Sequence, residues 1–172
     1  MKVLLVGSGG REHALGWRIN QSPNLTKMWV AGGNAGTAAL AENFNIRSSD
    51  IDALVSKASE VKADLVVVGP EAPLALGLAD RLYEVGIPVF GPSRAAAQSE
   101  ASKGFALTRM KEAGVPCPDF ASVRDQAGAR SYIKKHPGPL VVKADGLAAG
   151  KGVLLCEAVS YTHLTLPTSD LV

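Results

Sequence analysis

Short apolar runs that end in glycine constrain the fold of this chain more than any other sequence feature. Residues 3–6 and residues 65–68 are each four apolar residues in a row, and Gly7 and Gly69 follow them directly. Such runs suit strands that are buried on both faces, as in a parallel sheet with helices on both sides. Helical patterns follow the runs, so strands and helices alternate. The sequence therefore predicts an α/β fold with a doubly wound parallel sheet.

The alternation extends to Pro92, and a different pattern follows. Strands are predicted at residues 2–6, 28–31, 44–46, 64–69 and 87–90, with helices at 12–20, 51–61 and 73–85. Ser49 and Asp52 resemble a capping box for the second helix, and Gly86 has the position of a left-handed cap after the third. Further predicted elements are helices at 94–99, 102–113 and 127–135 and a hairpin of strands 139–143 and 153–156. The predicted domains are residues 1–92, a helical connector at 93–118 and the start of a second domain at 119–158.

Composition and charge exclude several classes of protein. With 172 residues, 47% of them apolar, the chain can bury a core without disulfides, and Cys117 and Cys156 have no metal-ligand spacing with the histidines. The net charge of +2 is small and dispersed, so we expect no nucleic-acid or membrane partner. The apolar runs are far shorter than the ~20 residues that span a bilayer. We see no signal-peptide pattern and expect a cytoplasmic chain.

The first glycine turn, residues 7–10, is a candidate anion site. It follows a buried strand and opens a helix, so main-chain N–H groups and the positive helix end would favour a phosphate. Arg11 could add a charge-assisted contact. The dinucleotide fingerprint would need a glycine where Glu12 stands, so a nicotinamide cofactor is not expected. The alternative is a tight turn that only packs the helix on the sheet.

A second candidate is Glu71, just after the strongest predicted strand. Open α/β folds bind ligands at this edge of the sheet, where a carboxylate can accept hydrogen bonds from sugar hydroxyls. The alternative is a carboxylate that only complements the helix dipole. For His13 the alternatives are a polar or acid–base contact and a helix-surface or packed histidine, and for Asn34 a ligand contact and a simple turn residue.

Residues 140–152 are the most informative stretch. Three glycines lie between two predicted strands, with Lys143 in the first strand and Lys151 among the glycines. A Walker loop would lead into a helix and place Ser or Thr after the lysine, so a hairpin flap over a polyphosphate fits better. Lys143 is expected to alternate inward, where its ammonium would need a fixed anion. The alternatives are a solvated glycine hairpin and, for Lys103, a surface position.

Taken together, these motifs resemble those of the glycinamide ribonucleotide synthetase family. The matching segments are residues 7–14, 33–37, 68–74, 90–92, 95–98, 102–103 and 141–153. Their order and spacing are too specific to arise by chance, and the resemblance covers residues 1–158. It implies a Rossmann-like N-terminal domain followed by an incomplete ATP-grasp domain.

The resemblance also implies an activity. Family members ligate glycine to 5-phosphoribosylamine through glycyl phosphate, giving glycinamide ribonucleotide, ADP and phosphate in purine biosynthesis, with Mg²⁺ (or Mn²⁺) bridging the phosphates of ATP. The implied ATP contacts are Lys103, Lys143, Gly146, Gly150, Lys151 and Gly152. The implied phosphoribosylamine contacts are Gly9, Gly10, Arg11 and Glu71. The resemblance implies no catalytic residue and no metal ligand within these residues.

This sequence departs from the family in length and at two places. Gly32 stands where the family has proline, and residues 159–172 match nothing expected, so we predict that they are foreign to the natural fold. Family members are more than twice as long, and their magnesium ligands lie beyond these residues, so we expect no ligase activity from this chain on its own. We also expect a monomer. The alternatives are another ATP-grasp enzyme, such as a carboxylase or formate-dependent synthetase, and a non-catalytic nucleotide or sugar-phosphate binding module.

Overall fold

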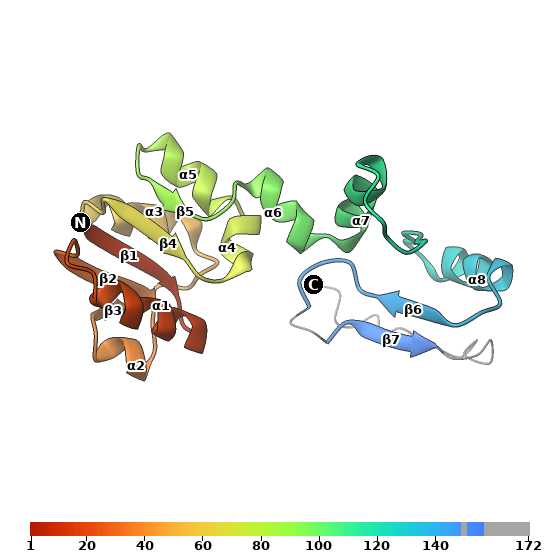
Figure 1. Cartoon of the computed structure of the whole chain (residues 1–172), viewed down its shortest axis with the longest axis horizontal. Coiled ribbons are helices and arrows are strands. Elements are labelled where there is room, and N and C mark those ends of the chain that lie inside the picture. The colour runs from red at the N-terminus through yellow and green to blue at the C-terminus, as the bar shows by residue number, and fades with distance from the viewer. Residues whose placement is uncertain (149–150, 157–172) are drawn as a thin grey trace. The chain divides into compact units, whose positions relative to one another are not determined.

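The computed structural model describes residues 1–148 and 151–156, and it divides the chain into two compact units. The first unit is Met1–Ala101 and the second begins at Ser102. In the first unit, strands and helices alternate as the sequence predicts (Figure 1). Its strands are β1 (Lys2–Gly7), β2 (Lys27–Gly32), β3 (Glu42–Phe44), β4 (Leu65–Val68) and β5 (Val89–Phe90). Its helices are α1 (Gly10–Asn20), α2 (Ala35–Ala38), α3 (Ile51–Glu60), α4 (Glu71–Ala75), α5 (Leu78–Glu84) and α6 (Arg94–Ala101).

The five strands form one parallel sheet in the order β3-β2-β1-β4-β5 (Figure 1). From β1 the chain first builds β2 and β3 on one side and then crosses to β4 and β5 on the other. Successive residues of a strand face opposite sides of the sheet. Val3 and Leu5 pack with residues of α1, whereas Leu4 and Val6 pack with residues of α3 and α5. Helices therefore cover both faces, which confirms the predicted doubly wound fold.

The helix predicted over residues 73–85 is wrong, because the structure has two helices there. Gly77, between α4 and α5, has a φ of 96°, a left-handed conformation that a right-handed helix does not contain. The predicted left-handed cap at Gly86 is confirmed by its φ of 74°. The N–H of Ile87 donates back to Leu82 O (2.9 Å), which closes the last turn of α5.

Most of the other predicted elements differ from the observed ones only at their ends. The helix predicted from residue 12 begins at Gly10, and the strand predicted at 44–46 is β3, which ends at Phe44. The helix predicted at 94–99 extends to Ala101. This helix, α6, packs against α4 and so belongs to the first unit. The strands follow in the predicted order, but the short helix α2 was not predicted and two helices replace the one predicted at 73–85.

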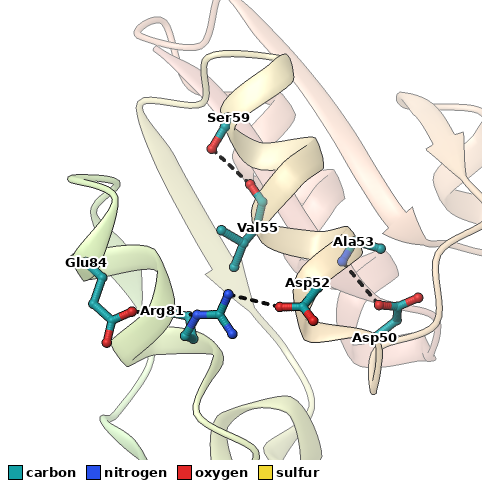
Figure 2. Close-up of polar contacts among 7 residues, drawn as sticks. All are labelled: Asp50, Asp52, Ala53, Val55, Ser59, Arg81 and Glu84. Carbon is teal, nitrogen blue, oxygen red and sulfur yellow. Dashed lines mark hydrogen bonds and ion pairs between the residues drawn. The ribbon is translucent and has the colours of Figure 1, made fainter.

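Figure 2 shows how α3 begins and how it is tied to α5. Asp50 is the N-cap, and its carboxylate accepts the N–H of Ala53 (3.1 Å). The capping box predicted from Ser49 is therefore wrong, because Asp50 occupies the cap position one residue later. Arg81 of α5 lies 2.9 Å from Asp52 of α3, so an exposed ion pair joins the two helices over the core (Figure 2).

The second unit contains α7 (Lys103–Glu112), α8 (Gln126–Lys135), β6 (Leu140–Lys143) and β7 (Val153–Cys156). β6 and β7 pair antiparallel, with Leu140 opposite Cys156 and Lys143 opposite Val153, which confirms the predicted hairpin. Among the residues that the structure describes in this unit, none is buried. No helix in the described part of the chain is both long and apolar enough to cross a membrane.

Candidate functional site

The carboxyl ends of β1 and β4 carry four of the predicted site residues. These strands are parallel neighbours, and β1 and β4 begin the two halves of the sheet that extend in opposite directions. Open α/β sheets bind ligands beyond the strand ends at such a reversal. The glycine turn and Arg11 follow β1, and Glu71 follows β4. The fold therefore brings Gly9, Gly10, Arg11 and Glu71 to one edge of the sheet.

Arg11 joins the two strand ends. Its Nη1 donates to the carbonyl oxygen of Gly69 (2.7 Å) and lies 3.7 Å from Oε2 of Glu71. Both side chains stay exposed, 65% for Arg11 and 48% for Glu71. A guanidinium has five N–H donors, so these two contacts leave donors for an anion. The exposed carboxylate of Glu71 can accept hydrogen bonds from hydroxyl groups of the same ligand.

The N-terminus of α1 supplies main-chain donors beside Arg11. The first main-chain hydrogen bond of the helix runs from the N–H of His13 to Gly9 O (3.1 Å). The N–H groups of Gly10 and Arg11 precede it, so the helix itself offers them no acceptor. A Cβ on Gly10 would meet nothing within 4 Å, which leaves the approach to these donors open. This end of the helix therefore favours a phosphate.

Asn34, in the loop after β2, braces the glycine turn. Its Nδ2 donates to Ser8 O (3.0 Å) and to Gly9 O (3.1 Å). Its Oδ1 accepts the N–H of Thr37 (3.0 Å), which fixes the side chain as the N-cap of α2. The sequence marks Asn34 as a turn residue, but its bracing role depends on partners in another loop. No local signal identifies those partners.

Glu12 and His13 contact neighbouring loops. Glu12 is only 4% exposed, and its Oε2 accepts the N–H of Gly9 (2.6 Å). The ring of His13 lies against Gly36, where a Cβ would come within 2.5 Å of His13 Cε1, but the residue is exposed, so the alternative of a helix-surface or packed histidine is supported. In the sequence Glu12 stands out only because it breaks the dinucleotide fingerprint. A glutamate at the third position of a helix is the signal that predicts its contact with Gly9.

In the second unit, Lys103 and the glycine loop lie together. The Nζ of Lys103 donates to Gly146 O (2.7 Å). Lys103 is the first residue of α7, whose N-cap is Ser102, and the Ser102 hydroxyl oxygen accepts the N–H of Phe105 (3.1 Å). The structure therefore brings together two predicted site residues, Lys103 and Gly146, that are far apart in the sequence.

Asp145, which the sequence analysis did not single out, holds this arrangement. Its Oδ1 accepts the N–H groups of Lys103 (2.6 Å) and Gly104 (3.3 Å), and its Oδ2 accepts the hydroxyl of Ser102 (3.0 Å). Partial burial acts to raise the pKa of Asp145, but the hydrogen bonds that it accepts outweigh this effect and lower the pKa below its ordinary value of 3.8. The donors, in order of effect, are Gly104, Ser102, Lys103 and Gly146.

Lys143 does not have the inward orientation predicted from its strand. It is exposed, and it lies on the same face of β6 as Val141, which is 53% exposed, while Leu140 and Val142 on the other face are half-buried. An exposed ammonium keeps its hydration and needs no fixed anion, so the argument from buried charge does not apply to Lys143.

The other predicted residues of the glycine loop are only partly described. Lys151 is exposed, and its N–H donates to Ala148 O (2.8 Å). Gly152 accepts the N–H of Ala144 (2.8 Å), and a Cβ there would lie 2.9 Å from Ala144 Cβ, so the loop closes tightly at this point. Gly150 lies outside the described residues, as does the tail predicted to be foreign to the fold.

The described residues offer no metal site. They contain no group of three or more His, Cys, Asp or Glu placed to hold a metal ion. Cys117 and Cys156 are free thiols, as expected. No residue within 1–148 or 151–156 is therefore assigned to magnesium or manganese.

Comparisons with known proteins agree with this division of the chain. Residues 1–100 match the family described as phosphoribosylglycinamide synthetase, N domain, and residues 101–165 match the ATP-grasp (A) domain of the same synthetase. A phosphoribosylamine–glycine ligase of Brucella melitensis is 54% identical over 155 residues, and one of Vibrio vulnificus is 50% identical over 157 residues. These alignments cover 90% of this chain and 36% and 37% of the two relatives.

A solved structure gives the same result. The phosphoribosylamine–glycine ligase of Thermotoga maritima superposes with a TM-score of 0.73 and 32% identity, over 94% of this chain and 37% of that one. The chain thus spans little more than a third of the length of the relatives that it matches. The resemblance predicted from the motifs, including an ATP-grasp part after the parallel sheet, is confirmed. The chain belongs to the phosphoribosylglycinamide synthetase family.

Proposed function

We propose that this chain serves the ATP-dependent ligation of glycine to 5-phosphoribosylamine, which yields glycinamide ribonucleotide, ADP and phosphate in purine biosynthesis. The observation that carries the proposal is the order of the two family matches along the chain. The N domain and the ATP-grasp domain of one synthetase match consecutive parts of the chain, and relatives that are about half identical are named for this ligation. A monomeric state and a cytoplasmic location remain predictions.

In this proposal the first unit binds 5-phosphoribosylamine. The N–H groups of Gly10 and Arg11 and the Arg11 guanidinium hold its phosphate, because they are the donors at the N-terminal end of α1. Glu71 accepts hydrogen bonds from the ribose hydroxyls, and its carboxylate is exposed for this purpose. Gly9 keeps the approach to the phosphate free of a side chain.

The second unit binds ATP in the same proposal. Lys103 exchanges the carbonyl oxygen of Gly146, which it contacts in this structure, for an oxygen of a phosphate. Lys143 and Lys151 are exposed, so their ammonium groups are accessible to the phosphates. The glycines of the loop, Gly146, Gly150 and Gly152, leave the backbone free of side chains that would separate it from the nucleotide.

The reaction then needs no nucleophile from the protein. A carboxylate oxygen of glycine attacks the γ-phosphorus of ATP, the bond to the β,γ-bridging oxygen breaks, and ADP leaves. The amine nitrogen of phosphoribosylamine attacks the carbonyl carbon of glycyl phosphate, inorganic phosphate leaves, and the nitrogen loses a proton to become an amide. Positioning and charge neutralisation supply the catalysis. A divalent cation, Mg²⁺ or Mn²⁺, neutralises phosphate charge when it is bound.

A chimeric enzyme tests the proposal. Residues 1–156 of this chain would replace the matching part of the Brucella melitensis ligase, and ADP formation would be measured with phosphoribosylamine generated from ribose 5-phosphate and ammonia. We expect ADP formation that requires both glycine and ribose 5-phosphate. Lys103→Ala in the chimera should raise the KM for ATP, whereas Lys111→Ala, at the far end of α7, should not.

Three results would contradict the proposal. A folded chimera that forms no ADP, while the unaltered relative does, would show that this chain cannot support the ligation. Tight binding of ribose 5-phosphate and of ATP without turnover would favour the non-catalytic binding module instead. Turnover that depends on bicarbonate or formate rather than on glycine would favour another ATP-grasp enzyme.

A further inference from the structure

Glu12 is a buried carboxylate for which the proposed reaction has no use. It is 4% exposed and lies between the carboxyl ends of β1 and β4, the strands that carry the candidate sugar-phosphate site. A Cβ on Gly7 would lie 2.6 Å from Glu12 Cγ, and a Cβ on Gly69 would lie 2.6 Å from Glu12 Cδ. Real Cβ atoms essentially never approach so closely, so these two glycines form a cradle for the Glu12 side chain.

The carboxylate of Glu12 acts on the glycine turn. Its Oε2 accepts the N–H of Gly9 at 2.6 Å, a short distance typical of a hydrogen bond to a charged acceptor. In the dinucleotide fingerprint the residue at the position of Gly9 lets the backbone approach a pyrophosphate, and the position of Glu12 is a third glycine. In this chain the anionic side chain of Glu12 stands at the position of the third glycine, and it accepts the N–H of Gly9 at the position of the second. The donors that remain for a ligand therefore include those of Gly10 and Arg11.

We propose that Glu12 is a positioning residue for the sugar-phosphate site. By fixing the Gly9 peptide from inside the sheet edge, it directs the next N–H groups, of Gly10 and Arg11, toward one phosphate group. Arg11 ties the same two strand ends from the solvent side through Gly69 O. The inference rests on the proposed function for its ligand, a sugar carrying a single phosphate, but the role of Glu12 in the turn does not.

Substitutions at Glu12 separate the effect of side-chain length from the effect of the negative charge. Glu12→Gln keeps an acceptor oxygen at the same distance, whereas Glu12→Asp keeps the charge but is too short to reach Gly9, and Glu12→Ala has neither. With ribose 5-phosphate as the probe and titration of the whole chain as the assay, Glu12→Ala and Glu12→Asp should each weaken binding about tenfold, the effect of losing one hydrogen bond to a charged group. Glu12→Gln should stay within about threefold of the unaltered chain.

The cradle predicts a rescue that a general loss of structure would not give. Gly69 does not have a positive φ, so alanine suits its backbone and only the contact with Glu12 opposes it. Gly69→Ala alone should weaken ribose 5-phosphate binding about tenfold, because Glu12 is displaced. In the Glu12→Ala background the same change should weaken ribose 5-phosphate binding less than about twofold, since the space that the Glu12 side chain fills is then empty.

Two ligand-independent readouts keep the outcomes distinct. Both tryptophans, Trp17 and Trp29, lie in the first unit, so their fluorescence reports whether that unit is folded. Solvent exchange of the Gly9 amide should be slow in the unaltered chain and in Glu12→Gln, and fast in Glu12→Asp and Glu12→Ala. If the unaltered chain does not bind ribose 5-phosphate, the proposed function fails in this unit, and Gly9 exchange alone decides the role of Glu12.

The proposal is overturned by any of three results. The first is that folded Glu12→Asp or Glu12→Ala binds ribose 5-phosphate as tightly as the unaltered chain. The second is that Gly9 exchange is equal in all variants. The third is that Gly69→Ala weakens ribose 5-phosphate binding equally with and without the Glu12 side chain, because the cradle would then have no part in shaping the turn.

Discussion

The chain contains two glycine segments, the first turn at residues 7–10 and a second turn at Gly146, where the glycine loop begins. A carboxylate forms the stabilising hydrogen bonds at each of them, but in different ways. In the first unit, Glu12 accepts the N–H of Gly9 from a position that is almost completely buried. In the second, Asp145 accepts the N–H groups of Lys103 and Gly104 from an exposed position. The first arrangement depends on packing, because the carboxylate fills a space between strands. The second depends on hydrogen bonds and charge alone.

The difference follows from the burial of the two units. Both faces of the parallel sheet are covered, and Leu4, Leu5 and Val6 of β1 are fully buried. In the described part of the second unit no residue is buried, and Leu155 of β7 is 71% exposed. We infer that the first turn is sensitive to side-chain volume and the second to ionisation.

Removing apolar side chains should have very different effects in the two units. Leu4→Ala leaves a cavity in the covered sheet, and the free energy of unfolding should fall by about 2–5 kcal/mol. Leu155→Ala removes a side chain that is mostly in water, so the change should stay within about 0.5 kcal/mol. Urea unfolding followed by circular dichroism measures both. Equal losses would contradict the contrast in burial.

Arg11 should matter for ligand binding and not for stability. Arg11→Ala removes an exposed guanidinium from the first glycine turn, and the affinity for ribose 5-phosphate should fall by about 1.5–3 kcal/mol, the range for hydrogen bonds to a charged group. Arg18→Ala is the matched control, since Arg18 lies on the same helix and its Nη1 donates to Gln21. Calorimetric titration gives both affinities. A similar loss in the two variants would remove Arg11 from the site.

The second turn should loosen in acid. The pKa of Asp145 is lowered in the folded protein, so its stabilising effect is complete above the ordinary value of 3.8 and is lost as the pH falls through the lowered pKa. Carboxyl NMR should therefore place the midpoint of Asp145 below 3.8, and Ser102→Ala should move it upward because one donor is gone. A midpoint at or above 3.8 in the unaltered chain would contradict the assignment.

Loss of the N-cap should have different effects on a helix of the first unit and a helix of the second unit. Asp50 caps α3 and Asp125 caps α8, each by accepting a main-chain N–H. Each substitution by alanine should cost about 1 kcal/mol locally. Because α3 buries Leu54 against the sheet and α8 has no buried residue, Asp50→Ala should keep its helix while Asp125→Ala frays its own. Cα chemical shifts measure this. Fraying of both helices to the same extent would show that burial does not support α3.

Much of the fold is predictable because it depends on local patterns. The apolar runs that end at Val6 and Val68 identify strands buried on both faces, and glycine at position 86 identifies the end of α5. Gly77 interrupts a helical pattern from inside, and a single glycine in such a pattern is compatible with a continuous helix. The break between α4 and α5 therefore depends on tertiary structure and was not predicted.

The candidate site is predictable only in part, for a physical reason. Gly9, Arg11 and Glu71 follow strands, and parallel strands bring their carboxyl ends to one edge. The bracing residues have no such signal. Asn34 donates to a loop that is separated from it by a helix and a strand, and Asp145 accepts from residues at the start of a helix far earlier in the chain. Such pairs are set by the fold, and neither residue type nor spacing identifies them in advance.

The most direct test of this account is a titration of the isotope-labelled chain with ribose 5-phosphate, followed by amide NMR. We predict that the signals of Gly9, Gly10 and Arg11 shift with a single saturating curve, while those of residues from Ser102 onward stay unchanged. If no signal in the first glycine turn shifts at saturating ribose 5-phosphate, or if the shifts lie only in the second unit, the assignment of the first unit as the sugar-phosphate site is wrong.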